Sequence, residues 1–132
     1  EQNMLRAFVL ILGLGLCAPA LAHSDSKWTK GPQGGHIVDA GGGKQHWELV
    51  AKGNELTLYV LDADEKPVAV GSGSAKAQVL IGGKTHNVDL KPAGNNTLKA
   101  AGTFTATKGM KVIVTTNKIG GQSFQARLAP MN

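Results

Sequence analysis

The sequence predicts an all-β domain: a single immunoglobulin-like β-sandwich, or a related Greek-key sandwich or barrel. Two observations support this fold class. From Gly31 onward, apolar and polar residues alternate with a period of two, and Gly, Asn or Pro interrupts the alternation about every eight to twelve residues. No window after Ala22 repeats apolar residues at the i, i+3, i+4, i+7 spacing of an amphipathic helix. Almost no helix is therefore expected.

Strands are expected wherever the alternation runs uninterrupted between turn residues. Gly53-Asn54 and Gly82-Gly83 each suit a two-residue hairpin loop, because these residues tolerate positive φ. In chain order the expected strands are His36–Ala40, His46–Lys52, Glu55–Asp62, Val68–Gly71, Ala75–Ile81, Lys84–Leu90, Thr97–Ala101, Gly102–Thr107, Lys111–Lys118 and Gln122–Ala129.

One face of most of these strands is apolar, and these faces predict the core. Two facing layers would interdigitate them across about 10 Å. The expected core residues are Trp47, Leu49, Ala51, Leu56, Leu58, Val60, Val79, Ile81, Val88, Leu90, Val112, Val114, Phe124, Ala126 and Leu128.

The N-terminal residues have the pattern of a cleavable signal peptide. Arg6 supplies the positive charge, Ala7–Leu16 is an apolar run of about ten residues, and Ala20-Leu21-Ala22 fits an A-x-A cleavage site. The apolar run is too short to span a bilayer as a helix. Cys17 suggests a lipoprotein, but Leu16 stands where a lipobox has a small residue. We therefore expect a signal peptide over 1–22, with Met4 as the initiator, a loose segment over 23–30 and the sandwich over 31–132.

Export, together with the lack of cysteine in the mature chain, predicts a periplasmic domain. Cleavage removes Cys17, the only cysteine, so the mature chain has no disulfide. It also removes one base, Arg6, and one acid, Glu1, so the net charge stays at +5. The lysines are spread evenly along the chain, whereas nucleic-acid-binding proteins cluster their positive charge. We expect a monomer with no nucleic-acid partner and, after cleavage, no membrane span.

The sequence carries no recognisable catalytic motif. Gly83-Lys84-Thr85 resembles the end of a phosphate-binding loop, but Gln78 stands where the leading glycine belongs and no strand–loop–helix unit surrounds it. No nucleophile elbow supports a Ser/His/Asp triad. Without cysteine, the mature chain has no thiol nucleophile and no thiolate ligand. A non-enzymatic protein is expected.

A metal site is the sharpest functional hypothesis. His46 and Glu48 are two residues apart on one expected strand, so both point to the face opposite Trp47. His36 begins the neighbouring strand, and a hairpin would bring it close to them. Two imidazoles and a carboxylate suit zinc, copper(II), nickel or cobalt. The competing interpretation makes His36 and His46 ordinary surface residues at strand ends.

His23 gives a second metal hypothesis. Cleavage after Ala22 would leave His23 as the first residue, whose free amine and imidazole chelate copper together. A second histidine would complete such a site. The competing interpretation treats His23 as an arbitrary polar residue that follows the cleavage site.

Three runs in the first third of the domain form a distinctive motif: Gly31-Pro32-Gln33-Gly34-Gly35-His36, Val38-Asp39-Ala40-Gly41 and His46-Trp47-Glu48-Leu49-Val50. This motif resembles small secreted bacterial proteins that occur with heavy-metal resistance and efflux systems. The Gly-Pro-x-Gly-Gly pattern is also similar to the opening segment of some periplasmic adaptors of heavy-metal efflux pumps, and the resemblance continues through Glu55–Asp62 to Lys66-Pro67-Val68. The resemblance implies a periplasmic β-sandwich associated with heavy-metal transport, with His36, His46 and Glu48 at matching positions.

Together these features predict an exported, non-enzymatic binding or accessory protein in heavy-metal homeostasis or efflux. It would hold a divalent or copper ion at His36, His46 and Glu48, and its partner would be a heavy-metal efflux adaptor or another envelope protein. One alternative is a structural or interaction domain without a ligand, whose edge strands dock on such a partner by strand addition. Another is a copper enzyme or chaperone built on His23.

Overall fold

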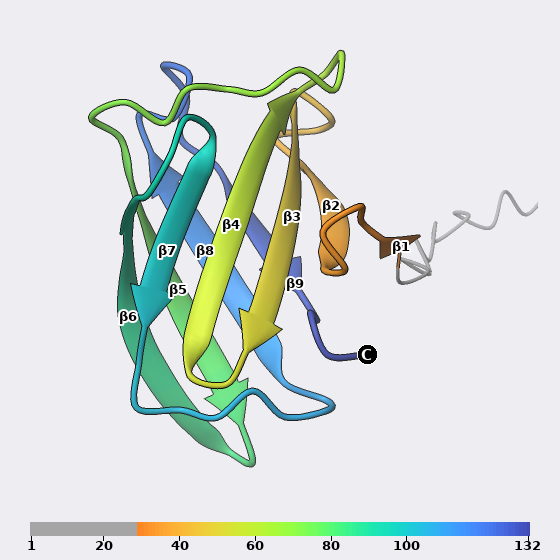
Figure 1. Cartoon of the computed structure of the whole chain (residues 1–132), viewed down its shortest axis with the longest axis vertical. Helices are drawn as coiled ribbons and strands as arrows, with labels where there is room; N and C mark the ends of the chain where they lie inside the picture. Colours follow the sequence, from red (N-terminus) through yellow and green to blue (C-terminus); the bar gives the residue numbers. More distant parts are fainter. Residues whose placement is uncertain (1–28) are drawn as a thin grey trace, which may run out of the picture.

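The computed structural model describes residues 29–132, and this part of the chain is all β (Figure 1). No helix occurs within it, and so none there is long and apolar enough to cross a membrane. The predicted signal peptide and His23 lie outside the described residues. The strands are β1 (Thr29–Lys30), β2 (His36–Ala40), β3 (Gln45–Lys52), β4 (Glu55–Asp62), β5 (Ser74–Ile81), β6 (Lys84–Pro92), β7 (Thr97–Ala101), β8 (Lys111–Asn117) and β9 (Gln125–Leu128).

The strands described form one antiparallel sheet of nine, in the order β1-β2-β3-β4-β7-β6-β5-β8-β9. β1, which the sequence assigns to the loose segment, pairs with the start of β2. Pairing between β6 and β7 is limited to Lys91 with Lys99 and Pro92 with Leu98, and the sheet folds over at this narrow join. As a result β7, β4 and β3 lie in front of β6, β5 and β8 in Figure 1, and the sheet curls into a half-barrel. The all-β prediction is confirmed.

Two hairpin loops lie where the sequence predicts them, and their glycines adopt positive φ, whereas Asn54 does not. Gly53-Asn54 closes the β3–β4 hairpin and Gly82-Gly83 closes the β5–β6 hairpin, each as a two-residue loop. The backbone φ is 58° at Gly53, 55° at Gly82 and 79° at Gly83. Glycine enters this left-handed region without a Cβ clash, so these residues fix where the two hairpins reverse.

The prediction of strands at Val68–Gly71 and Gly102–Thr107 is wrong, because both segments cross from one half of the curled sheet to the other. In the first segment, the Val70 N–H donates to the carbonyl of Asn95. In the second, two N–H groups donate to the carbonyls of the Gly53-Asn54 loop. Isolated hydrogen bonds of this kind satisfy buried backbone groups, as a strand ladder would. Alternating side chains therefore do not distinguish a crossing segment from a strand.

The inward-facing side chains of both halves pack into one core. The predicted core residues are all either buried or packed against buried residues. Those in strands lie on the inward face, and Phe124 lies just before β9. Alternation in regular strands did not identify several further members, which lie on strands, in crossing segments or, for Ile119, in the turn between β8 and β9. These additional buried residues are Ala40, Val70, Ala75, Ala77, Leu98, Ala100, Phe104, Met110 and Ile119.

The two ends of the sheet lie close together. β2 and β9 are neighbours in space, although no ladder joins them in the described structure. At one end of this seam the Ala129 N–H donates to Nδ1 of His36 at 2.8 Å. At the other end the Phe124 ring occupies the space where a Cβ on Gly41 would lie. A side-chain hydrogen bond and an aromatic ring therefore hold the half-barrel nearly closed.

Candidate functional site

The carboxylate of Glu48 holds the Gly31–Gly35 turn against β3. Glu48 points to the outer face of the sheet, yet it is only 5% exposed because the turn covers it. Its Oε2 accepts the N–H groups of Gln33 and Gly35, both at 2.9 Å, and its Oε1 accepts a longer bond of 3.3 Å from Gln33. A Cβ on Gly31 would collide with this carboxylate. Glycine at that position therefore allows the turn to lie directly on β3.

The remaining N–H groups of this turn are also paired. The Gly31 N–H donates to the carbonyl of Gly35 at 2.8 Å, and the Gly34 N–H donates to the carbonyl of Gly31 at 2.9 Å. Pro32 has no N–H to satisfy. The Gly-Pro-x-Gly-Gly pattern and Glu48 are thus one structural unit, a turn capped by a buried carboxylate. Both oxygens of Glu48 are engaged by backbone donors.

His36 lies on the inner face of the sheet, opposite Leu49 in the β2–β3 register. It is 5% exposed, and burial lowers the pKa of its imidazole below the ordinary value. His46 pairs with Asp39, three positions along the same ladder, and therefore points to the outer face. The structure does not bring His36 together with His46 and Glu48. The reason is the period of two, which gives His36 the same orientation as the core residue Ala40.

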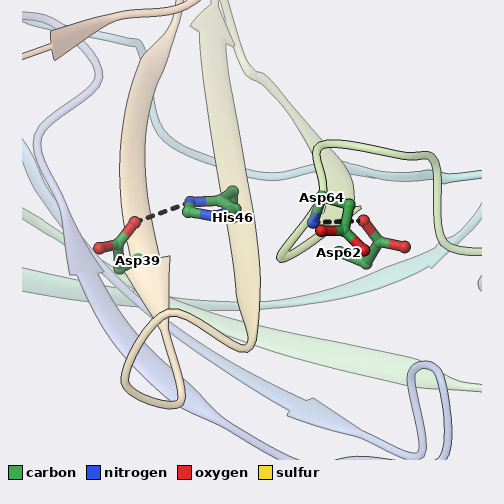
Figure 2. Close-up of polar contacts among 4 residues, drawn as sticks. All are labelled: Asp39, His46, Asp62 and Asp64. Carbon is green, nitrogen blue, oxygen red and sulfur yellow. Dashed lines mark hydrogen bonds and ion pairs between the residues drawn. The ribbon is translucent and has the colours of Figure 1, made fainter.

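His46 forms a cross-strand pair with Asp39, shown in Figure 2. Its Nδ1 lies 2.7 Å from Oδ1 of Asp39. Since a carboxylate accepts, Nδ1 carries the proton and donates, which leaves Nε2 as the ring nitrogen available to a ligand. No hydrogen bond or ion pair of this Nε2 occurs within residues 29–132. The arrangement is the one that orients a histidine toward a ligand.

Asp39 was not among the predicted site residues. The signal that identifies it is the hairpin itself: Ala40 and Gln45 flank a four-residue turn and pair with each other, so the next pair outward is Asp39 with His46. Figure 2 also shows Asp62 and Asp64 at the end of the neighbouring strand β4. Asp62 organises its own turn, since its Oδ1 accepts the N–H of Asp64 at 2.8 Å.

A pocket of about 120 Å³ opens beside His46 on the outer face of β3 and β4. Ile37, Tyr59 and Leu61 contribute apolar surface, and the Gly31–Gly35 turn forms one wall through Pro32 and Gln33. The complete lining is Pro32, Gln33, Ile37, His46, Trp47, Glu48, Tyr59, Leu61, Glu65 and Asn96. The pocket is therefore an apolar depression with polar and acidic groups around it.

Gln45 is a second residue that the sequence prediction missed. It is 3% exposed and bridges two elements: its Oε1 accepts the indole N–H of Trp47 at 3.0 Å, and its Nε2 donates to the carbonyl of Ile119 at 2.9 Å. The signal in the sequence is an amide side chain on the inward face of a strand, two residues before a buried tryptophan. Gln45 satisfies the indole and attaches β3 to the turn between β8 and β9.

The described residues contain no group of three or more His, Cys, Asp or Glu side chains placed to hold a metal ion. Of the predicted ligands, His36 is turned inward and Glu48 is engaged by the turn. His46 is the one whose second ring nitrogen faces outward without a partner in this part of the chain. Comparison of the chain with protein-family models, with curated proteins and with solved structures found no match.

Proposed function

We propose that the chain is an exported, non-enzymatic binding or accessory module of the cell envelope, and that the pocket beside the Asp39–His46 pair is its contact site. One observation carries this proposal. The most distinctive motif in the sequence forms the pocket, with the Gly31–Gly35 turn as one wall and His46 beside it. The partner we expect, from the resemblance of that motif, is a heavy-metal efflux adaptor or another envelope protein.

The pocket chemistry favours binding over catalysis. The Asp39–His46 pair resembles the base and orienting acid of a catalytic triad. A triad also needs a nucleophile, however, and the residues that line the pocket include no serine, threonine or cysteine. The apolar surface of Ile37, Tyr59 and Leu61 instead suits contact with an apolar group.

We also propose a Greek-key sandwich or barrel of the immunoglobulin-like kind as the finer class of the curled sheet. Its support is the strand order, in which β5, β6 and β7 are neighbours and β8 lies beside β5, as in a Greek key. The single core shared by both halves of the sheet agrees with this class.

Site-specific photocrosslinking in an exporting bacterial cell tests the binding function. A photoreactive phenylalanine analogue replaces Tyr59, and the control carries it at Gln78 on β5, in the other half of the sheet. We expect a discrete cross-linked partner from position 59 and none from position 78, and we expect Ile37→Trp, which fills the pocket, to abolish the product. Equal cross-linking from both positions, or none from either, rejects the pocket as a contact site.

A second candidate function is binding of a zinc or copper(II) ion through His46, which the unpartnered Nε2 favours. Titration of the mature protein with each metal, followed through its histidine NMR resonances, tests it. Saturable shifts of His46 that vanish in His46→Ala and persist in His36→Ala support this site. Shifts that need an untagged His23 indicate the N-terminal copper hypothesis instead, and the absence of any shift rejects both.

A further inference from the structure

Three exposed acidic residues lie at or next to the pocket, although the whole chain carries a net charge of +5. Asp39 is bonded to His46 at the pocket, and Glu65 belongs to the pocket lining. Asp64, the neighbour of Glu65 in the sequence, lies just past the end of β4 (Figure 2). We call the three residues Asp39, Asp64 and Glu65 the acidic rim. Asp62 is not part of it, because it pairs with the inward-facing Gln45 and its Oδ1 accepts two N–H groups of its own turn. Within the described residues, the only other acidic side chains are those of Glu48, Glu55 and Asp89.

The acidic rim is only partly neutralised. The lysines nearest in sequence are Lys44, in the β2–β3 turn, and Lys66, beside Glu65. Neither lysine forms a side-chain ion pair within the described residues. The ion pair found there joins the carboxylate of Asp39 to the imidazole of His46. The side chains of Asp39, Asp64 and Glu65 are exposed to solvent. This end of the outer face therefore presents negative charge on a molecule that is otherwise basic.

We propose that the pocket and the acidic rim form a docking surface for an extended, lysine- or arginine-bearing segment of a partner protein, which places one aliphatic side chain in the pocket. The inference rests on the proposed function, because it takes the pocket to be the contact site. It adds the chemical class of the partner, which the pocket alone does not determine.

Two observations identify this occupant. A volume of about 120 Å³ accommodates one side chain, whereas pockets for drug-sized ligands are typically about 300–1,000 Å³. Glu65 belongs to the pocket lining and Asp39 is bonded to His46 of the same lining, and both carboxylates are exposed, so cations that flank the inserted side chain would meet them. Complementary charge of this kind steers association and fixes the orientation of a bound segment.

The chain itself is a poor source of the segment. Its lysine and arginine residues are scattered over many turns and strands rather than grouped in one extended run. A second copy of the protein would also bind by unlike surfaces, which gives rings or open chains of molecules rather than a two-fold dimer. A separate protein with a compact basic segment fits the surface better.

Three synthetic peptides test the proposal with the purified mature protein in EDTA, followed by NMR of the backbone amides. The first is acetyl-Lys-Lys-Leu-Lys-Lys-amide, the second replaces its leucine by alanine, and the third replaces its lysines by glutamates. We expect the first to shift the amides of Ile37, His46 and Leu61, and to bind at least about fivefold more tightly than the alanine peptide. Raising the salt to about 0.15 M should weaken binding severalfold, because exposed charges are screened.

A matched pair of charge reversals separates the acidic rim from net charge. Glu65→Lys changes the rim, whereas Asp89→Lys makes the same change in charge on β6. We expect Glu65→Lys to weaken the lysine–leucine peptide about tenfold and Asp89→Lys to have little effect. Both residues are exposed, and a lysine at position 65 meets the same backbone φ of 62° as the glutamate does, so neither variant should unfold.

Equal binding of the acidic peptide, equal effects of the two charge reversals, or peptide shifts centred elsewhere would each overturn the proposal. Self-association of the peptide-free protein that Glu65→Lys abolishes would overturn it in favour of a second copy. If photocrosslinks form at position 59 while the basic peptide does not bind, the partner class is wrong and the contact site stands. If neither occurs, the proposed function fails as well.

Discussion

The imidazole of His36 links the two ends of the sheet, which no backbone ladder joins in the described structure. Its Nδ1 accepts the Ala129 N–H at 2.8 Å, and only an unprotonated Nδ1 can do so. Burial lowers the pKa of His36 below its ordinary value of 6.5, which agrees with a neutral ring in the folded state. The residue that the sequence offered as a metal ligand is thus a closing element of the fold.

His36 should make the stability of the protein fall in acid. Because its folded pKa is lowered, its contribution is complete above the unfolded pKa of 6.5 and is lost as the pH falls through the folded value. Urea unfolding measured between about pH 7.5 and about pH 5 checks this. His36→Asn is the control, since the Asn Oδ1 accepts the same N–H and does not titrate. A pH dependence equally steep in both proteins would contradict this role.

Glu48 should matter for stability more than an exposed carboxylate of the same sheet. In Glu48→Gln the amide oxygen can take the place of Oε2, but the side chain loses its charge and presents an NH₂ group where Oε1 accepts the Gln33 N–H. We expect a loss of about 1.5–3 kcal/mol in the free energy of unfolding, the range for hydrogen bonds to charged groups. Glu55→Gln, an exposed change at the start of β4, should stay within about 0.5 kcal/mol. Equal effects in the two variants would rule out the carboxylate cap.

At the scale of elements, the Gly31–Gly35 turn depends on a close approach that only glycine allows. Gly31→Ala places a Cβ against the Glu48 carboxylate and should lower the free energy of unfolding by about 2 kcal/mol or more. Gly94→Ala is the matched control, because its Cβ would lie 3.6 Å from the nearest atoms, those of Thr97, an ordinary contact. Chemical denaturation of both variants checks the difference. A Gly31→Ala protein as stable as the control would show that the turn moves freely off β3.

The sequence predicts the regular strands and their inward faces, because strand side chains alternate with a period of two and glycine loops fix the hairpins. The same alternation places His36 with Ala40 on the inner face, away from His46. It does not reveal contacts between distant segments: the bond from Ala129 to His36 and the bridge from Gln45 to Ile119 depend on how the sheet curls. The segment Gly102–Thr107 alternates like a strand because it too has one buried side, yet it crosses between the halves.

At the scale of the whole molecule, the seam between β2 and β9 has the His36–Ala129 bond but no ladder in the described structure, whereas ladders join the other neighbouring strands. Regions with few backbone hydrogen bonds open locally before the whole protein unfolds. Hydrogen exchange followed by mass spectrometry should therefore show β9 exchanging before β3 and β4. His36→Ala should accelerate amide exchange in β9, while the exchange rates of β3 and β4 keep the same ratio to each other. Simultaneous exchange of all three strands would show that the seam opens only with global unfolding.

The bridge made by Gln45 gives the molecule an internal optical reporter. The indole of Trp47 is fully buried, and its N–H donates to the side-chain amide of Gln45. The same amide donates to the carbonyl of Ile119, far along the chain. With Trp28 replaced by phenylalanine, Trp47 is the only tryptophan. The fluorescence of Trp47 would then report the loss of the contact between β3 and the β8–β9 turn, before the strands themselves separate.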